Sequence, residues 1–336
     1  SGSDADLMTI TYNNNGGSNY SYTVSSPPGA ITVTAAKALW LDVATIAWNG
    51  AAGVSYKLLY DPDGGLTTAA ESTACSFPAP AAPCFVTLAA SGTVSGYAKN
   101  PNATGLTRLL TGLSADNAKH LLQGQVVVAS YNSGGTRLDA TRVQAQSVLD
   151  ALYAASAKTQ VLGVSYSGSV PTLKVWAPTA KSLSIRKYED SSTTTYTSHA
   201  LSLDAASGVW SVTGAADWDR DFYLLDVEVY VPSADTVLHN LVSDPYAVAL
   251  SQDGAAAGDV RSQFVNLADS NLKPAGWDAL AKPALANFED ITVYEMHVRD
   301  FSINDGTVAA GDRGTYKAFT YDGTGPHPNT TLSDGM

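Results

Sequence analysis

The chain has 336 residues and a net charge of −12, with 45% hydrophobic and only 15% charged side chains. This composition is typical of a globular protein with full cores and excludes an intrinsically disordered chain. The acidic balance and the lack of a basic cluster argue against a nucleic-acid partner. No run of 18 apolar residues is present, so no membrane span is predicted.

The first part of the chain changes from linker-like to β-rich sequence. Residues 1–30 are rich in Asn, Gly, Ser and Pro, which predicts a linker or the end of an upstream domain. Residues 31–135 alternate short β-rich runs with turn signals, at the spacing of a β-sandwich. The run Asp61-Pro62-Asp63-Gly64-Gly65 is interpreted as a turn, because it lacks the acidic positions of an EF-hand calcium loop.

A helix is expected over about residues 141–155. Thr141 and Gln144 have the spacing of a capping box. An apolar stripe of helical period follows, formed by Ala145, Val148, Leu149 and Leu152. We interpret this stripe as a packing face that carries no chemistry.

Residues 160–265 return to β-rich patterning. In the run 222–230, Asp226 and Glu228 fall on one face of the predicted strand, and apolar residues fall on the other. This alternation predicts a second β-sandwich, which a loop-rich segment over residues 266–289 follows.

The two cysteines, Cys75 and Cys84, flank a Pro-rich loop. No histidine lies in this stretch, which argues against a zinc site, and the loop would suit a short disulfide. Two reduced cysteines are the alternative. A disulfide implies an oxidising compartment, so we expect a secreted, cell-surface or periplasmic protein.

Three segments carry a family resemblance. They are LQGQVVVASYN at 122–132, VWAPTA at 175–180 and DITVYEMHVRDFS at 290–302. In this order and spacing they resemble the pullulanase and limit-dextrinase type of debranching enzyme in the α-amylase superfamily. The resemblance covers about 180 residues and is weaker upstream of about residue 120.

The resemblance implies a mainly β chain with two tandem, immunoglobulin-like β-sandwich domains before a catalytic barrel. After a linker at 1–30, the first sandwich would occupy residues 31–158 and end in the helix. A sandwich similar to family 48 carbohydrate-binding modules would occupy residues 159–287. Residues 288–336 would begin a (β/α)8 barrel that is truncated here, with 291–298 as its first strand.

The resemblance also implies an activity. In this family the barrel hydrolyses α-1,6-glucosidic branch points by a retaining mechanism that uses two carboxylates. The implied partner is a branched α-glucan such as pullulan, starch, glycogen or limit dextrin. The catalytic carboxylates belong to later barrel strands, so no residue here is carried over as catalytic, and the chain alone is expected to be inactive. No cofactor or metal ligand is identified from these residues, although the superfamily implies calcium in the parent enzyme.

The first-strand motif is expected to have a structural or rim role rather than a catalytic one. Its polar and aromatic members are Tyr294, Glu295, His297, Arg299 and Asp300. A lone strand exposes unpaired backbone. We therefore expect 291–298 to pack on the second sandwich, or to pair with a crystal neighbour or with the missing barrel as a separate polypeptide. The segment after about residue 302 is expected to be mobile unless a neighbour holds it.

Sugar binding by the β-domains would require exposed aromatic rings. Trp218 lies among charged residues and is expected to be exposed, and Trp40 and Trp48 flank Asp42. These three tryptophans are the candidate sugar-stacking residues, with burial in a core as the alternative. Trp176 and Trp210 are expected in the core or at a domain junction.

Two other functions remain open at this point. The chain could be a stand-alone α-glucan-binding or scaffold protein, in which residues 291–336 would be a vestige. It could also be an isoamylase-type or branching-type relative, although the match over residues 122–150 argues against that alternative.

Overall fold

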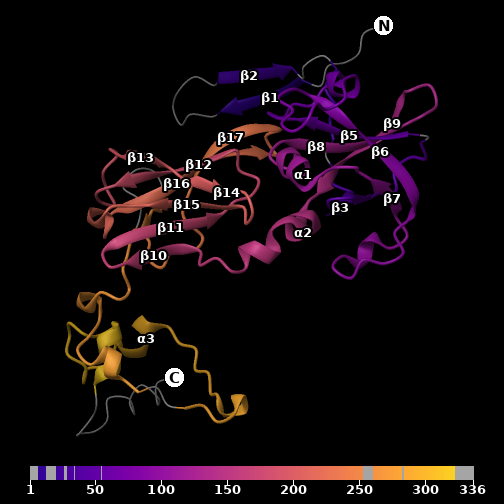
Figure 1. Ribbon diagram of the computed structural model, residues 1–336. Helices are drawn as coiled ribbons and strands as arrows, with labels where there is room; N and C mark the ends of the chain where they lie inside the picture. The colour runs from indigo at the N-terminus through magenta and orange to yellow at the C-terminus, as the bar shows by residue number, and fades with distance from the viewer. Residues whose placement is uncertain are drawn as a thin grey trace. The chain divides into compact units, whose positions relative to one another are not determined.

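The computed structural model describes residues 7–12, 20–25, 29–33, 35–53, 55–252, 260–281 and 284–321. The chain divides into two compact units, Ser1–Asp269 and Ser270–Met336. The first unit contains an antiparallel hairpin of β1 (Leu7–Tyr12) and β2 (Tyr20–Ser25), a β-barrel and a β-sandwich. Its fold is mainly β, as predicted (Figure 1).

The first domain is a closed barrel rather than the predicted open sandwich. Its strand order is β3-β4-β7-β6-β5-β8-β9. The strands are β3 (Ala38–Asp42), β4 (Thr45–Ala47), β5 (Ser55–Asp61), β6 (Cys84–Thr93), β7 (Thr107–Leu110), β8 (Gln125–Tyr131) and β9 (Arg137–Gln144). Parallel pairing of β3 with β9 closes the barrel, so neither of these strands is left as an open edge.

Two helices accompany the barrel, α1 (Ala115–Leu121) and α2 (Gln146–Ala157). The predicted helix start was wrong, because Thr141 and Gln144 belong to β9. The Thr141 hydroxyl accepts a bond from the Lys37 amide and donates to the Ala35 carbonyl, so it serves the barrel seam instead of a helix cap. The predicted apolar stripe does pack on the barrel core, with Val148 fully buried there.

The second domain is a sandwich of two antiparallel sheets that share one core. One sheet has the order β10-β11-β15-β14, with β10 (Gly163–Ser167), β11 (Val170–Trp176), β15 (Val209–Thr213) and β14 (Ser202–Asp204). The other has the order β13-β12-β16-β17, with β13 (Thr197–Ala200), β12 (Ser182–Tyr188), β16 (Phe222–Val231) and β17 (Thr236–Val242), and β18 (Ser262–Gln263) pairs with β16. Leu173 from the first sheet and Leu225 from the second lie in the same cluster, as the period-two alternation requires.

The barrel and the sandwich join through direct bonds within the first unit. The Val237 amide donates to the Asp63 carbonyl at 3.0 Å. The Lys181 ammonium group lies 2.7 Å from an Asp63 carboxylate oxygen and donates to the Pro62 carbonyl. The Asp61–Gly65 run is a turn, in which the Asp63 amide donates to the Asp61 carboxylate. This turn therefore belongs to the domain junction.

The second unit does not contain the predicted barrel strand. Residues 291–297 form no strand, and helix α3 (Val298–Ser302) follows them directly. The side chains of Val293 and Tyr294 are exposed. A barrel strand is stabilised by ladders on both sides, and no strand of the described chain pairs with this segment, so it takes an irregular extended form.

Residues 303–321 are held by local contacts. Phe301 and Phe319 stack with ring centroids 4.3 Å apart, and the Gly314 amide donates to the Ser302 hydroxyl. The expected mobility after residue 302 stays a prediction, and residues 322–336 lie outside the described part of the chain. No helix in that part is long and apolar enough to cross a membrane.

Candidate functional site

The three predicted sugar-stacking residues are buried, so this prediction was wrong. Trp40 lies on β3 and Trp48 directly follows β4, and both are buried in the barrel core. Trp218 is only 7% exposed. Its ring packs at 4.5 Å from that of His199 and 5.4 Å from that of Phe264, between the sheets of the sandwich. None of the three presents a face to a ligand.

Of the six tryptophans, Trp176 and Trp277 are the exposed ones, at 37% and 59%. Trp176 is the last residue of β11, where the strand leaves the sheet. The sequence predicted a core or domain-junction position for both Trp176 and Trp210; Trp176 lies outside the core, next to residues of the barrel domain, and Trp210 is buried. In β11 the residues alternate, with Leu173 and Val175 buried and Thr172, Lys174 and Trp176 on the other face, so the period-two pattern itself places Trp176 outward.

A tight turn holds the ring of Trp176 in place. The indole Nε1 donates to the Ser207 carbonyl at 3.0 Å. Ser207 is fully buried, and its hydroxyl donates to the Asp204 carboxylate, while the Gly208 amide donates to the Asp204 carbonyl. Hydrogen bonds from Ser207 and Ala206 lower the pKa of Asp204, so this carboxylate stays charged and keeps the turn closed.

The turn requires glycine at position 208. Its φ is +71°, and an added Cβ would lie 2.7 Å from the Cβ of Pro178 and 3.1 Å from the Tyr153 ring. Pro178 belongs to the VWAPTA motif, and Tyr153 is on α2. The motif therefore brings the turn, the end of β11 and the barrel domain's helix into contact around the base of Trp176.

A groove of about 460 Å³ lies beside the indole ring. Its walls come from both β-domains: Lys99, Gln146, Ser147, Leu149, Asp150, Ala154 and Trp176. Lys99 Nζ lies 2.6 Å from an Asp150 carboxylate oxygen, and the hydrogen bond to Asp150 raises the pKa of Lys99. The two charges cancel, so the groove offers polar donors and acceptors with little net charge. No nucleophile with an adjacent base lines it.

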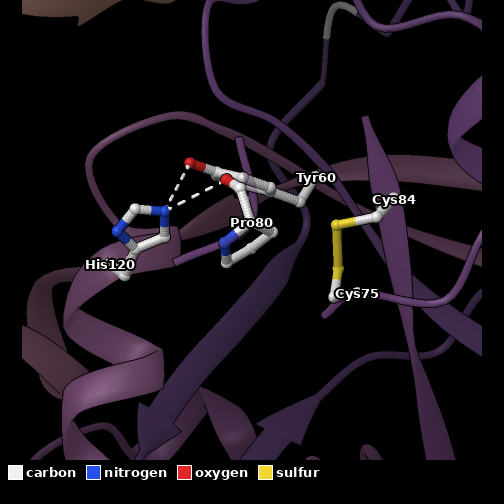
Figure 2. Close-up of a disulfide and its surroundings, with 5 residues drawn as sticks. All are labelled: Tyr60, Cys75, Pro80, Cys84 and His120. Atoms are coloured by element: carbon white, nitrogen blue, oxygen red, sulfur yellow. Dashed lines mark hydrogen bonds between the residues drawn. A yellow bond between two sulfur atoms is a disulfide. The ribbon is translucent and has the colours of Figure 1, made fainter. Parts of the chain in front are cut away.

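The disulfide site is structural. Cys75 and Cys84 form a disulfide, and Cys84 is buried at the start of β6 (Figure 2). On the loop that it closes, the Pro80 carbonyl lies 3.2 Å from Nε2 of His120 on α1, and the Tyr60 hydroxyl lies 3.4 Å from the same nitrogen (Figure 2). Burial and the nearby Asp61 and Asp63 charges raise the pKa of Tyr60 to about 12, so it is a neutral hydrogen-bonding group here.

The barrel-strand motif shows no catalytic arrangement. Asp300 carboxylate oxygens lie 3.5 Å from Nδ1 of His297 and 3.5 Å from a terminal nitrogen of Arg299, and all three side chains are about two-thirds exposed. Glu295 and Tyr294 are exposed as well. In the part of the chain that the structure describes, no group of three or more His, Cys, Asp or Glu side chains could hold a metal ion.

Two protein-family models match the chain in sequence. The Pullulanase N2 domain matches residues 35–151, which contain the barrel and the first half of α2. Carbohydrate-binding module 48, also described as the isoamylase N-terminal domain, matches residues 161–247, which contain most of the sandwich. The groove beside Trp176 is thus formed by residues of both matched domains.

The curated relatives that match this chain are also pullulanases. Pullulanase 1, chloroplastic, of Arabidopsis thaliana is 38% identical over 204 residues, which are 60% of this chain and 20% of the relative. A pullulanase of Klebsiella pneumoniae is 38% identical over 208 residues, which are 61% of this chain and 18% of the relative. The chain thus spans about a fifth of the length of these relatives.

A solved structure of Klebsiella pneumoniae pullulanase complexed with maltotriose matches with a TM-score of 0.72 and 33% sequence identity. The match covers 86% of this chain and 27% of that structure. The apo pullulanase of the same organism matches with a TM-score of 0.72 and 32% identity. Together, these matches identify the chain as carrying the N2 and family 48 domains of the N-terminal part of a pullulanase-type protein.

Proposed function

We propose that this chain is the accessory part of a debranching enzyme that hydrolyses α-1,6-glucosidic linkages in pullulan, limit dextrin, glycogen and starch. The observation that carries the proposal is the structural match to pullulanase over 86% of the chain. The order of the N2 and family 48 domains supports it as well.

In our proposal, the residues that catalyse the hydrolysis lie outside this sequence. A retaining glycosidase needs two carboxyl groups about 5–5.5 Å apart, one as nucleophile and one as acid and base. The carboxylates of the motif, Glu295 and Asp300, lie on an exposed segment and form no such pair with a pocket. We therefore assign the retaining reaction to a (β/α)8 domain that these residues do not form, and we expect the 336-residue chain alone to be inactive.

The location of the protein is proposed on separate grounds. The Cys75–Cys84 disulfide is compatible with an oxidising environment. We therefore place the enzyme outside the cytoplasm, either secreted, at the cell surface or in a periplasm.

The test combines intact mass measurement with release of reducing ends from pullulan. The purified 336-residue chain is expected to release none, whereas a longer product of the same gene that includes a barrel is expected to be active. Hydrolysis by the pure 336-residue chain would overturn the assignment of the chemistry. Following the anomer that the longer product releases tests the stereochemistry, because retention requires that the α-anomer appears first.

A further inference from the structure

The groove beside Trp176 has the features of a carbohydrate subsite. We propose that it binds a linear segment of α-glucan, with one glucosyl ring stacked on the exposed indole face. The ligand class rests on the function proposed above. The position rests on the structure, because Trp176 combines an exposed ring with a concave neighbourhood.

The indole ring is held in a fixed orientation. Its Nε1–H group donates to the carbonyl of the buried Ser207, in a turn that hydrogen bonds of Ser207 and Gly208 to Asp204 hold closed. The ring is therefore already oriented before a ligand arrives, and little side-chain entropy is lost on stacking. Tryptophan suits this role because it presents a large apolar face, which can cover the C–H face of a sugar ring.

The polar lining of the groove matches a neutral polyhydroxyl ligand. Lys99 and Asp150 pair across its rim and are each about half exposed, so they offer both donors and acceptors with no net charge. The side chains of Gln146 and Ser147 also line the groove, and no described residue bonds to either of them. An anionic or cationic ligand would meet both signs of charge and gain little. The volume of about 460 Å³ lies within the range of small-molecule sites, roughly 300–1,000 Å³.

Both β-domains are needed for this subsite. Lys99 and helix α2 come from the N2 domain, and Trp176 comes from the family 48 domain. Tyr153 of α2 packs against the turn at Gly208, so the same contact joins the domains and positions the platform. The subsite therefore depends on the junction and would not exist on either domain alone.

The test is calorimetric titration of the 336-residue chain with maltoheptaose. Wild type is expected to bind, and Trp176→Ala is expected to weaken binding by about ten-fold or more, as for loss of an aromatic anchor. Trp176→Tyr should retain part of the affinity, because it keeps an aromatic face. Trp277→Ala is the control, since it removes the other exposed tryptophan, which does not line the groove, and should leave the affinity unchanged.

A second variant separates the site from a folding defect. Ser147→Arg places a bulky side chain in the groove on a helix surface and leaves the indole intact, so it should also abolish binding while the thermal midpoint stays near that of wild type. Unchanged affinity in Trp176→Ala or in Ser147→Arg overturns the subsite. Failure of the wild-type chain to bind millimolar maltoheptaose also overturns it. The debranching proposal is tested separately, by pullulan hydrolysis by the longer gene product.

Discussion

At the residue scale, the tryptophans show that the neighbours in the sequence do not decide which side chain is exposed. Trp218 is flanked by Asp217 and Asp219 but turns inward from a short 3-10 helix. An added Cβ at Gly214 would lie 2.3 Å from this ring, so the absence of a side chain there makes room for it. Trp176 is the last residue of β11 and lies on its outward face, with Thr172 and Lys174. Burial depends on which segments meet in three dimensions, and a single sequence does not give that information.

The environment of Asp226 predicts that the stability of the fold depends on pH. Burial raises its pKa, but the hydrogen bonds and charges of Arg186 and His239 lower it by more, so the net pKa lies below the ordinary value. Such a carboxylate stabilises the fold above its unfolded pKa, and this contribution is lost as the pH falls through the folded pKa. Asp226→Asn is expected to cost about 1–3 kcal/mol of unfolding free energy at pH 7. Below about pH 4 the difference from wild type should shrink.

Urea unfolding at pH 7 and at pH 3 measures this effect. Asp278→Asn is the control, because its carboxylate is 72% exposed in its pair with Lys273 and should cost little. An equal difference between wild type and Asp226→Asn at both pH values would show that the charge of Asp226 does not contribute.

At the element scale, the disulfide loop links a strand to a helix. The bond between Cys75 and Cys84 closes a sequence separation of nine residues, and the loop places the Pro80 carbonyl against His120. The Tyr60 hydroxyl reaches the same ring from β5. The loop therefore supports one end of α1, which lies over the barrel core through Ala118 and Leu121.

Removing the disulfide should destabilise the barrel. Cys75→Ser/Cys84→Ser is expected to lower the unfolding free energy by about 2–3 kcal/mol, from the loop-closure entropy of a short loop. Urea denaturation with and without reductant checks this, because reductant should bring wild type to the midpoint of the double variant and leave that variant unchanged. Equal midpoints for oxidised wild type and the double variant would contradict the expectation.

Elements made by local patterns were predictable, and elements made by distant pairing were not. The alternation around Asp226 and Glu228 predicted a strand of the sandwich, and the spacing of the cysteines allowed the disulfide. Barrel closure depends on pairing between β3 and β9, about a hundred residues apart, which no local pattern shows. The strand expected at 291–298 failed for the same reason, since its apolar residues describe a strand only when neighbours pair with it. The groove was missed because its two walls come from different domains.

At the scale of the whole molecule, Asp235 is a shared acceptor between the two β-domains. Its Oδ1 lies 2.7 Å from Nε2 of Gln125, 2.8 Å from the Tyr230 hydroxyl and 3.4 Å from a guanidinium nitrogen of Arg142. Gln125 and Arg142 belong to barrel strands, and Asp235 lies in the turn between β16 and β17 of the sandwich. Its φ of +54° is one that Asp and Asn tolerate better than other side chains.

Substitutions at Asp235 should therefore be graded. Asp235→Asn keeps the backbone preference and an acceptor but loses the charge, so it is expected to lower the unfolding free energy by about 1 kcal/mol. Asp235→Ala should lower the unfolding free energy by about 2–3 kcal/mol, because Gln125 loses its partner and alanine is strained at this φ. Urea denaturation of the 336-residue chain measures both. Asp278→Asn is the control, because the carboxylate it replaces is 72% exposed in its pair with Lys273. Equal stabilities of the two Asp235 variants would contradict a role for the shared acceptor.

The backbone bond from Val237 to Asp63 has a consequence for protein engineering. This backbone bond and the side chains of Lys181 and Asp235 join one domain to the other. Cutting between residues 151 and 161 would therefore expose unpaired donors and acceptors on both pieces. We therefore expect that the family 48 domain cannot be transferred alone to another enzyme. The transferable unit is the barrel and the sandwich together, with the Trp176 groove carried between them.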